Sequence, residues 1–352
     1  MSVAPPRPLS SLLCSHDSHV KKEEIPMKKL LQLCTAFALT ASFAATALAQ
    51  EFRLLSGWDK NYAYSPAMVD PFMKGVQEGS KGRITFKVSG PETVPPFEQL
   101  EPVSSGVFQF LFTHGAYHFG TTPAMTVVEA FNGDLAAVRA SGLFDVLDKH
   151  YQRHQLKLVM LPVSPPGAYN FLLRSPVNAQ GDLAGRKIRA VSNYSGIIKL
   201  LNATSTVLPA SDVYTGLDKG LIDGTAWPVI GMLDFRWNEV AKYLLRPSFG
   251  VNYQPLFMNL AAWNKLSKQD QELMSSVARQ VEDAWYKNAN ALWADEEAKL
   301  KAKGMVVTKM GDAHAAKLQA AWASGLLDAS AAKDAKFTAE IRKFGTEKGL
   351  LK

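Results

Sequence analysis

The sequence predicts an α/β fold of two lobes with a cleft between them, on three observations. Between residues 185 and 228, short strand-like runs alternate with helical ones, which is typical of parallel strands joined by crossover helices. One continuous helical pattern runs from Ser267 to Gly304. Loop-forming stretches near 162–168 and 246–255 separate neighbouring strands, as segments that pass from one lobe to the other would.

The beginning of the chain differs in composition from the rest. Residues 1–26 carry no sustained apolar period, whereas Met27 is followed by two lysines, an apolar run over 30–43 and small residues that end at Ala49. This is the layout of a secretory signal peptide, and the run is shorter than the roughly 20 apolar residues of a membrane-spanning helix. We therefore expect residues 27–49 to be a signal peptide cleaved after Ala49, and the residues before it to be a non-native N-terminal extension.

The cysteines and the charge balance restrict the function. Cys14 and Cys34 both precede the predicted cleavage site, so the mature chain must be stabilised by its own core. Removal of residues 1–49 takes away five Lys or Arg and three Asp or Glu, which lowers the formal net charge from +7 to +5. The basic residues are spread out rather than clustered, which argues against a nucleic-acid partner. A weak positive field suits a small anionic ligand.

Hydrophobic patterns predict the individual elements in order. Apolar runs or apolar-polar alternation indicate strands, and apolar residues at helical spacing between cap and breaker residues indicate helices. The predicted strands are 52–57, 83–88, 107–112, 156–161, 169–173, 187–191, 205–209, 221–227, 243–245, 256–260 and 305–308. The predicted helices are 65–79, 97–105, 135–154, 193–201, 213–219, one through 235–237 that ends near 242, 267–304 and 313–349. From this order we expect residues 50–166 with about 278–315 in one lobe, and residues 167–277 with about 316–352 in the other.

Arg189 is the leading candidate for a binding residue. It stands where the predicted strand 187–191 ends, and ligands of open α/β sheets gather at the carboxyl ends of strands. The planar guanidinium group can form two parallel charge-assisted hydrogen bonds with a carboxylate. The sequence therefore predicts a receptor for an anion, against the alternative of a surface arginine on an edge strand.

Five further residues are candidates for the same pocket. His114 follows a buried strand and could be a polar pocket residue. Trp58, Tyr169 and Trp227 could form apolar walls against the carbon body of a ligand, with core packing as the alternative. Asn252 could donate an amide hydrogen bond to a ligand, or form a turn beside the glycine that precedes it by two positions.

The histidine spacing also invites a metal interpretation, which we do not favour. His114 and His118 are four residues apart, as are His150 and His154. Gly115 makes a continuous helix across the first pair unfavourable, and neither pair is accompanied by an H-e-x-x-H motif or a cysteine ligand. We expect no metal site and no cofactor, and we expect the second pair to be exposed on a helix.

The motifs of the chain resemble those of one known family. Over residues 51–352, the chain resembles the periplasmic substrate-binding proteins of tripartite ATP-independent periplasmic (TRAP) transporters, the DctP-like receptors. The motifs that carry the resemblance are 185–189, 211–217 and 221–224, of which the last two stand in the family's SEVYxAL…G.VDG segment, with support from 97–100, 106–108 and 252–254. The resemblance implies a two-lobe periplasmic-binding-protein-like fold, in which each lobe is a mixed sheet flanked by helices, with hinge strands and a long helix that spans both lobes.

The same resemblance implies a function and roles for individual residues. It implies a monomeric periplasmic receptor, not an enzyme, that traps a small organic acid by closing its lobes and delivers it to TRAP membrane permease subunits. Arg189 matches the family's carboxylate-binding arginine, and Tyr169 or a neighbour stands where the family often has a second arginine. Asn252, His114 and Trp227 occupy positions that contact substrate or line the cleft in some members.

Two other functions remain as alternatives. A secreted hydrolase is one, although the chain lacks a G-x-S-x-G elbow, a catalytic cysteine, a phosphate-binding glycine-rich loop and a zinc signature, and Asp212 and Asp223 read as structural caps. A ligand-sensing partner of a membrane signalling receptor is the other, and it would use the same pocket. The single candidate arginine and the aromatic residues favour a mono-, keto- or hydroxy-carboxylate, or a lactam acid, over a dianionic C4 acid.

Overall fold

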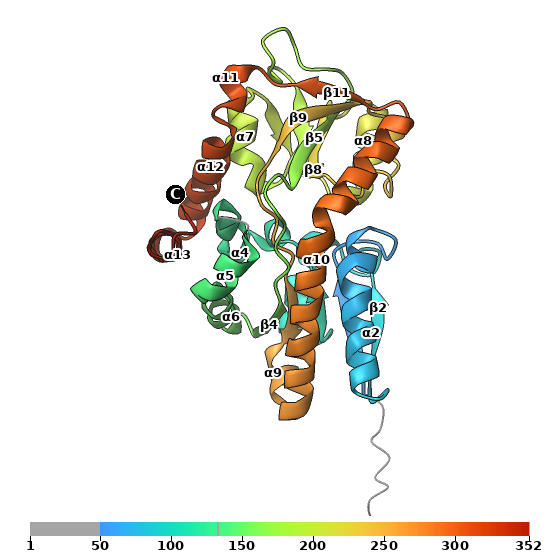
Figure 1. The fold of residues 1–352 in the computed structure, drawn as a ribbon, viewed down its shortest axis with the longest axis vertical. Helices are drawn as coiled ribbons and strands as arrows, with labels where there is room; N and C mark the ends of the chain where they lie inside the picture. The colour runs from blue at the N-terminus through green and yellow to red at the C-terminus, as the bar shows by residue number, and fades with distance from the viewer. Residues whose placement is uncertain (1–49, 132–133, 352) are drawn as a thin grey trace, which may run out of the picture. The chain divides into compact units, whose positions relative to one another are not determined.

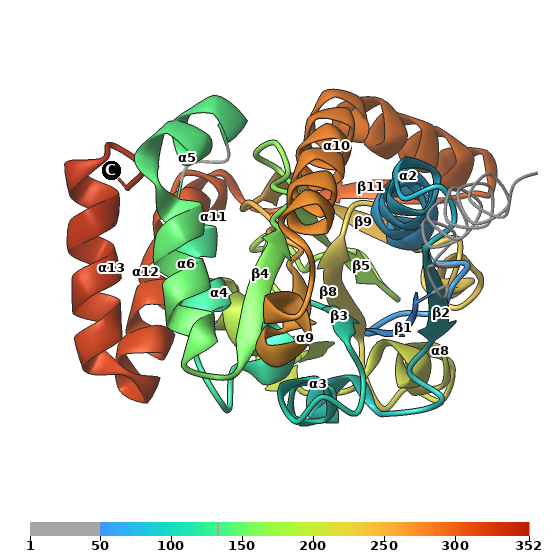
Figure 2. The same cartoon turned by 90° about the horizontal axis from the view of Figure 1, so that it is seen from below.

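A computed structural model of the protein describes residues 50–131 and 134–351, which form two β-sheets with helices around them (Figure 1). The predicted signal peptide and N-terminal extension lie outside the described residues. The two sheets define two lobes, so the predicted two-lobe α/β class is confirmed. Figures 1 and 2 show α12 (Leu318–Lys333) and α13 (Ala335–Glu347) on one side, and α10 (Lys268–Ala302) with α2 (Asp70–Gly79) on the other.

The first sheet has five strands in the order β2-β1-β3-β10-β4. These strands are β1 (Gln50–Ser56), β2 (Ile84–Ser89), β3 (Phe110–Phe112), β4 (Leu156–Met160) and β10 (Leu256–Asn259). Strands β2 and β3 run parallel to β1, whereas β10 is antiparallel to both β3 and β4. The carboxyl end of β3 therefore faces the same way as that of β1, and His114 follows it as the N-terminal cap of the next helical turn.

The second sheet has six strands in the order β11-β9-β5-β8-β6-β7. These strands are β5 (Tyr169–Leu173), β6 (Lys187–Arg189), β7 (Thr204–Thr206), β8 (Gly224–Pro228), β9 (Tyr243–Phe249) and β11 (Val306–Lys309). Strand β6 is parallel to β7 and β8, and β5 is antiparallel to β8 and β9. Arg189 thus ends a strand that has a neighbour on each side, so the alternative of an edge strand is wrong.

Helices and short helical turns fill the connections. The remaining helices are α3 (Leu100–Ser104), α4 (Ala124–Val127), α5 (Leu135–Ser141), α6 (Leu143–Gln152), α7 (Ser195–Leu200), α8 (Ala210–Asp218), α9 (Leu260–Asn264) and α11 (Asp312–Ala315). The short turns are η1 (Ser65–Val69), η2 (Pro96–Glu98), η3 (Gly115–His118), η4 (Val128–Ala130), η5 (Ser192–Tyr194) and η6 (Trp237–Glu239). Helix α10 begins at Lys268, one residue after the predicted start, and Ser267 caps it: its hydroxyl accepts a hydrogen bond from the backbone N–H of Asp270 at 3.1 Å.

Two extended segments pass side by side between the lobes. The backbone N–H of Ser164 donates to Asn252 O at 2.9 Å, and that of Gly167 donates to Gly250 O at 2.8 Å. Both segments therefore form a paired, antiparallel connection at the places where the sequence predicted crossing loops. A third connection is α10, which packs against α2 and β4 and leads to β11 in the second sheet.

The strand pairing corrects the predicted lobe ranges at two points. Strand β10 lies in the first sheet although residues 167–277 were expected in the second lobe, and β11 lies in the second sheet although 278–315 were expected in the first. The physical reason is that the chain has already crossed between lobes before each strand begins, once after Phe249 and once along α10.

Some predicted helices are shorter than expected. The helix expected through Phe235 and Trp237 is only the turn η6, because Arg236 adopts a left-handed conformation with φ 58°. The helix expected over 135–154 is divided into α5 and α6 at Gly142, which has φ 82°.

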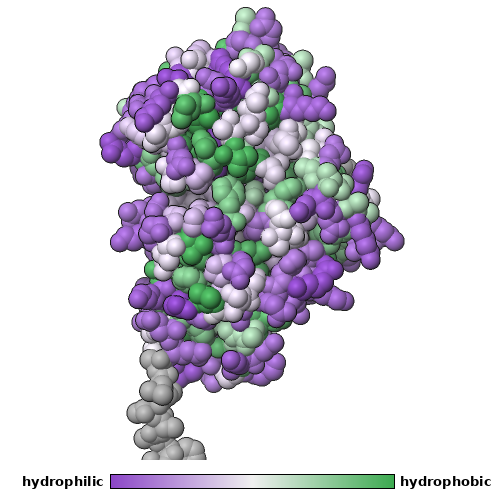
Figure 3. Space-filling model, turned by 180° about the vertical axis from the view of Figure 1, so that it is seen from behind, coloured by the Kyte–Doolittle hydropathy of each residue, from purple (hydrophilic) through white to green (hydrophobic). Residues whose placement is uncertain are grey.

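Both faces of both sheets are covered by apolar side chains. Neighbouring residues of β1 belong to different apolar clusters: Leu54 is in the cluster that contains Phe72 and Trp285, and Leu55 is in the cluster that contains Met125 and Leu158. Each cluster continues from the first sheet into the second, so the lobes share buried apolar surface. On the face seen in Figure 3, hydrophilic residues cover the rim and hydrophobic residues gather across the middle.

Candidate functional site

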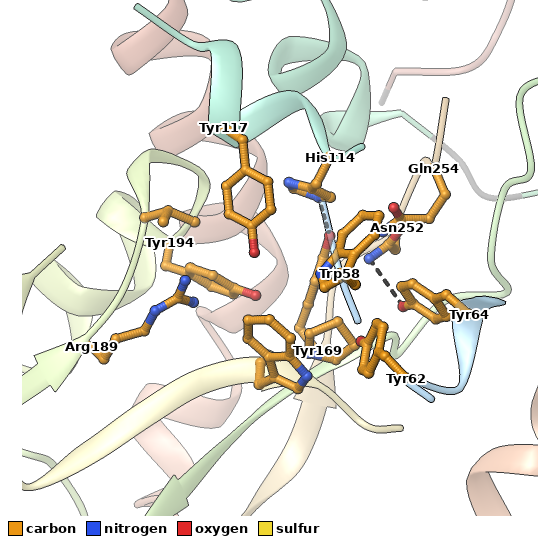
Figure 4. Close-up of a pocket in the computed structure, with 13 residues that line it drawn as sticks. Trp58, Tyr62, Tyr64, His114, Tyr117, Tyr169, Arg189, Tyr194, Asn252 and Gln254 are labelled. Carbon is orange, nitrogen blue, oxygen red and sulfur yellow. Dashed lines mark hydrogen bonds between the residues drawn. The ribbon is translucent and has the colours of Figure 1, made fainter. Parts of the chain in front are cut away.

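A pocket with about 290 Å³ of space free of atoms lies between the two sheets, and all six predicted site residues line it (Figure 4). The first lobe and the crossing segments contribute the loop after β1, the end of β3 and residues 252–254, and the second lobe contributes the ends of β5, β6 and β8. The lining residues are Trp58, Tyr62, Tyr64, His114, Tyr117, Tyr169, Arg189, Val191, Tyr194, Trp227, Pro228, Asn252 and Gln254.

Arg189 is buried in this pocket, with 1% of its surface exposed. Its Nε donates to Leu208 O at 2.8 Å, its Nη1 lies 3.5 Å from Ala226 O, and its guanidinium carbon lies 5.0 Å from the centre of the Trp227 ring. Its Nη2 has no hydrogen-bond partner among the described residues. The backbone carbonyls and the indole therefore orient the guanidinium group and leave one of its nitrogens available.

No described carboxylate forms an ion pair with Arg189, although it is the one Lys or Arg among the described residues that is buried. A buried charge without a counter-ion is strongly unfavourable, and buried charges in proteins are normally paired. The pocket is therefore positively charged at one point and electrostatically suited to an anion.

Aromatic rings form most of the wall. Trp58 stacks on Tyr62 with 5.8 Å between ring centres, and Tyr62 contacts Trp227 edge-on at 6.0 Å. The indole Nε1 atoms of Trp58 and Trp227 are buried and have no hydrogen-bond partner among the described residues. Burial raises the pKa of Tyr117, and the positive charge of Arg189 acts against that rise, so this hydroxyl stays neutral and can donate or accept a hydrogen bond. Such walls combine apolar area with polar edges.

Asn252 is held by its neighbours in the crossing segment. Its backbone N–H donates to Ser164 Oγ at 2.9 Å, and its side-chain oxygen accepts from Gln254 Nε2 at 2.6 Å. Its Nδ2 donates to Tyr64 Oη at 3.4 Å (Figure 4). The unpartnered polar atom of this pair is Gln254 Oε1.

His114 and Tyr169 share a buried carboxylate, Glu129, which lies behind the pocket and is 1% exposed. His114 Nδ1 accepts from the backbone N–H of Ala116 at 3.1 Å, so the proton of the neutral ring lies on Nε2. That Nε2 lies 2.7 Å from Glu129 Oε1, and Tyr169 Oη donates to the same oxygen at 3.0 Å. The other oxygen accepts from Asn193 Nδ2 at 3.0 Å. Burial, and then the charge of Glu129, raise the pKa of Tyr169.

The other histidines have structural partners. His118 Nε2 lies 2.7 Å from Tyr151 Oη, and His150 Nε2 lies 2.7 Å from Thr122 Oγ1. Burial lowers the pKa of His118 to about 3 and that of His150 to about 4. His150 is buried, so the prediction that it is exposed was wrong. Within residues 50–131 and 134–351, no three His, Cys, Asp or Glu side chains are grouped as a metal site would require.

Sequence reasoning missed several residues of the site. Tyr117 and Tyr194 closely follow β3 and β6, so the rule of strand ends could have found them. Tyr62, Tyr64 and Gln254 lie in loops without a pattern that distinguishes them from core aromatic or turn residues. Asp223 is structural as expected, because its Oδ2 accepts from the backbone N–H of Lys187 at 2.8 Å.

Similar proteins are known by sequence and by structure. The chain is 24% identical over 344 residues to a monocarboxylate 2-oxoacid-binding periplasmic protein of Nostoc sp., covering 88% of this chain and 91% of that protein. DctP7 of Bordetella pertussis, an extracytoplasmic solute receptor binding pyroglutamic acid, has a TM-score of 0.74 and 18% identity, covering 85% of this chain and 100% of that chain. A TRAP periplasmic solute binding protein from Desulfovibrio salexigens with bound orotic acid has a TM-score of 0.75 and 20% identity, covering 85% and 98%. These two structures show that the fold is shared.

The described helices and the family comparison complete the assignment. Among the helices of residues 50–131 and 134–351, none combines the length and the apolar character needed to cross a membrane. The family model described as bacterial extracellular solute-binding protein, family 7 (DctP), matches residues 58–333. The chain therefore belongs to the family 7 bacterial extracellular solute-binding proteins.

Proposed function

We propose that this protein is a periplasmic receptor that binds an organic carboxylate through Arg189 and delivers it to a TRAP-type membrane transporter. One observation carries the proposal: Arg189 is buried between the lobes, has no acidic partner among the described residues and keeps Nη2 free. A carboxylate would supply the missing counter-ion, with charge-assisted hydrogen bonds worth roughly 1.5–3 kcal/mol each. Of the proteins to which this chain is similar, the three named above are described with a 2-oxoacid, pyroglutamic acid and orotic acid as ligands, and all three are carboxylates.

The other predicted residues take supporting roles in this proposal. Trp58, Trp227 and Tyr169 form the wall against which the body of the ligand packs. Asn252 holds Gln254 by the 2.6 Å hydrogen bond, and Gln254 presents its oxygen to the ligand. His114 contacts the pocket with its ring and keeps its polar atoms bonded to protein groups.

The site binds its ligand without catalysis in this proposal. No Ser, Thr or Cys is among the lining residues, and both ring nitrogens of His114 are engaged by protein atoms. A Ser, Thr or Cys nucleophile activated by an adjacent free base is the usual arrangement of a hydrolase that forms a covalent intermediate, and the lining has no such pair. Ligand recovered chemically unchanged after prolonged incubation with purified protein would support binding alone.

The location and the partners complete the proposal. The signal-peptide pattern of residues 27–49 supports export to the periplasm and cleavage after Ala49. The mature chain acts as a monomer. It closes on its ligand because both lobes line the pocket, so contacts to both lobes favour the bound, closed state. The closed form is the one that the membrane permease subunits recognise.

A thermal-shift screen of carboxylates, followed by calorimetry, tests this function. A ligand at about 100 times its Kd should stabilise the protein by about 2.7 kcal/mol. Arg189→Ala should abolish the shift, and Arg189→Lys should weaken binding at least about tenfold, because an ammonium group cannot replace the planar fork. Lys187→Ala, on the same strand but exposed, is the matched control and should bind normally. Unchanged affinity in Arg189→Ala would refute the proposed site.

A further inference from the structure

The pocket holds a single positive charge that a ligand can use. Among its lining residues, Arg189 and His114 are the two that carry or can acquire a positive charge, and no Asp, Glu or Lys is present. His114 is not available to a ligand, because Ala116 N–H occupies Nδ1 and the Nε2 proton is directed at Glu129 and Tyr169. The site therefore offers one cationic group.

A negative charge stands directly behind this lining. Glu129 is buried and accepts hydrogen bonds at both oxygens, from Tyr169 and Asn193, with His114 at 2.7 Å. These contacts place it one side chain away from the pocket, on the side that His114 and Tyr169 line. A second carboxylate on a ligand would find no counter-ion there and would face this buried like charge.

The polar atoms left without partners are few and mostly of one kind. Among the described lining residues, the buried side-chain atoms without a hydrogen-bond partner are the N–H donors Arg189 Nη2, Trp58 Nε1 and Trp227 Nε1, together with Tyr62 Oη and the acceptor Gln254 Oε1. Figure 4 shows Arg189, Trp58, Tyr117 and Tyr194 directed toward a common space. Arg189 Nη2, Trp58 Nε1 and the neutral hydroxyl of Tyr117 can donate to one carboxylate in that space, whereas Gln254 Oε1 can accept from one ligand N–H or O–H group.

Seven of the lining residues are aromatic, and Val191 and Pro228 add further apolar surface. Among the described lining atoms, the unpartnered ones that can accept a hydrogen bond are Tyr62 Oη and Gln254 Oε1. A ligand with more hydroxyl groups than these atoms can serve would bury unsatisfied donors, each unfavourable by about 1–3 kcal/mol. The cavity itself is about 20 Å³, little more than the room for one water molecule, so the side chains must separate to admit a ligand and a small body requires the least separation.

From these contacts we propose that the pocket selects small monocarboxylates with a mainly apolar body and discriminates against dicarboxylates and sugar acids. This inference rests on the proposed function, since it concerns the ligand of the same site. Arg189 pairs with the single carboxylate, the indole N–H groups and Tyr117 complete its hydrogen bonds, and the aromatic rings cover the carbon body. Selectivity arises from what the pocket withholds, namely a second cation and additional acceptors.

Matched pairs of ligands test the inference on the purified wild-type protein by thermal shift and calorimetry. Glutarate and its monoamide glutaramate have the same shape and differ in one charge. Glucuronate and tetrahydropyran-2-carboxylate share a ring and a carboxylate and differ in the hydroxyl groups. Wherever a pair binds, we expect the Kd of the dianion or of the hydroxylated acid to be at least about tenfold higher than that of its partner.

The outcomes separate this inference from the proposed function. Tighter or equal binding of glutarate or glucuronate, relative to its partner, would overturn the selectivity while supporting carboxylate binding. A panel of mono- and dicarboxylates in which none stabilises the protein would instead overturn the proposed function itself. A ranking with monocarboxylates of low hydroxyl content at the top would support both.

Discussion

The backbone N–H of Ala63 donates a 2.8 Å hydrogen bond to Oδ2 of Asp234, and this bond joins the two lobes beside the pocket. Ala63 follows β1 of the first sheet, and Asp234 follows β8 of the second. Tyr62, next to Ala63, stacks on Phe235 with 5.1 Å between ring centres. The loop that carries Asp234 is also tied to α10, because Leu233 N–H donates to Glu296 Oε1 at 3.0 Å. We call Tyr62, Ala63, Asp234 and Phe235 the clasp.

Removal of the clasp's hydrogen bond should weaken ligand retention. The bond exists only while the lobes are together, so Asp234→Ala should destabilise the closed form relative to an open one. A hydrogen bond of this kind is worth about 0.5–1.5 kcal/mol net, so we expect the ligand dissociation rate to rise about two- to thirteenfold in stopped-flow measurements. Asp328→Ala, an exposed acid on α12, is the control and should leave the rate unchanged. A wild-type rate in Asp234→Ala would mean that the clasp does not hold the lobes.

Gly231 should be essential for the clasp for a steric reason. It has φ 90°, and a Cβ atom at this position would lie 2.0 Å from Cε2 of Tyr62. Gly231→Ala should therefore push Tyr62 away or keep the lobes apart, and raise the ligand Kd at least about tenfold in calorimetry. Gly304→Ala is a matched control, because Gly304 has φ 85° and no atom within 4 Å of the added Cβ. Equal Kd values for the two variants would show that backbone strain alone, and not the contact with Tyr62, matters.

Local sequence patterns were sufficient to place Arg189 but not its surroundings. The alternation of 187–191 predicted a strand whose carboxyl end carries Arg189, and both the strand and its place inside a sheet follow from residues close in sequence. The six predicted site residues line one pocket for the same reason, because most of them stand at the end of a strand or in a crossing loop.

Residues positioned by distant contacts could not be predicted. Glu129 is held by Trp322, which donates to its backbone oxygen at 2.9 Å from 193 positions along the chain, and by Asn193. No periodicity or motif around Glu129 indicates that these partners meet there. The exchange of β10 and β11 between the lobes has the same origin, since sheet membership depends on pairing between segments far apart in sequence.

His118 should make the stability of the protein depend on pH in mildly acidic solution. Burial lowers its pKa from 6.5 to about 3, so the unfolded chain takes up a proton at this residue before the folded protein does. Above pH 6.5 the ring is neutral in both states, and the stability of the folded protein is not reduced by His118. As the pH falls from 6.5 toward 3, the unfolded state binds the proton and the free energy of unfolding decreases. Each such histidine should reduce the free energy of unfolding by about 1.4 kcal/mol per pH unit within that window.

Denaturant titrations at pH 7.5 to 4.5 check this prediction by comparing wild type with His118→Gln. Asp234, Glu282 and Glu296 have pKa values raised by burial, so they increase the free energy of unfolding as the pH falls. They are present in both proteins and cancel in the comparison. His150, with its pKa lowered to about 4, also remains in both. The difference in slope should therefore be about one proton. Parallel curves for the two proteins would contradict the assignment of this proton uptake to His118.

Glu129 should set the preference between singly and doubly charged ligands. Glu129→Gln keeps the shape of the side chain and its oxygen for Asn193 or Tyr169, but removes the negative charge behind the pocket. Because that charge repels a second carboxylate more than an amide, the ratio of the Kd for glutarate to the Kd for glutaramate should fall at least about threefold. Glu347→Gln removes the same charge from an exposed position on α13 and should leave the ratio at its wild-type value. If both variants keep the wild-type ratio while Glu129→Gln retains its melting temperature, the charge of Glu129 does not contribute to the preference for singly charged ligands.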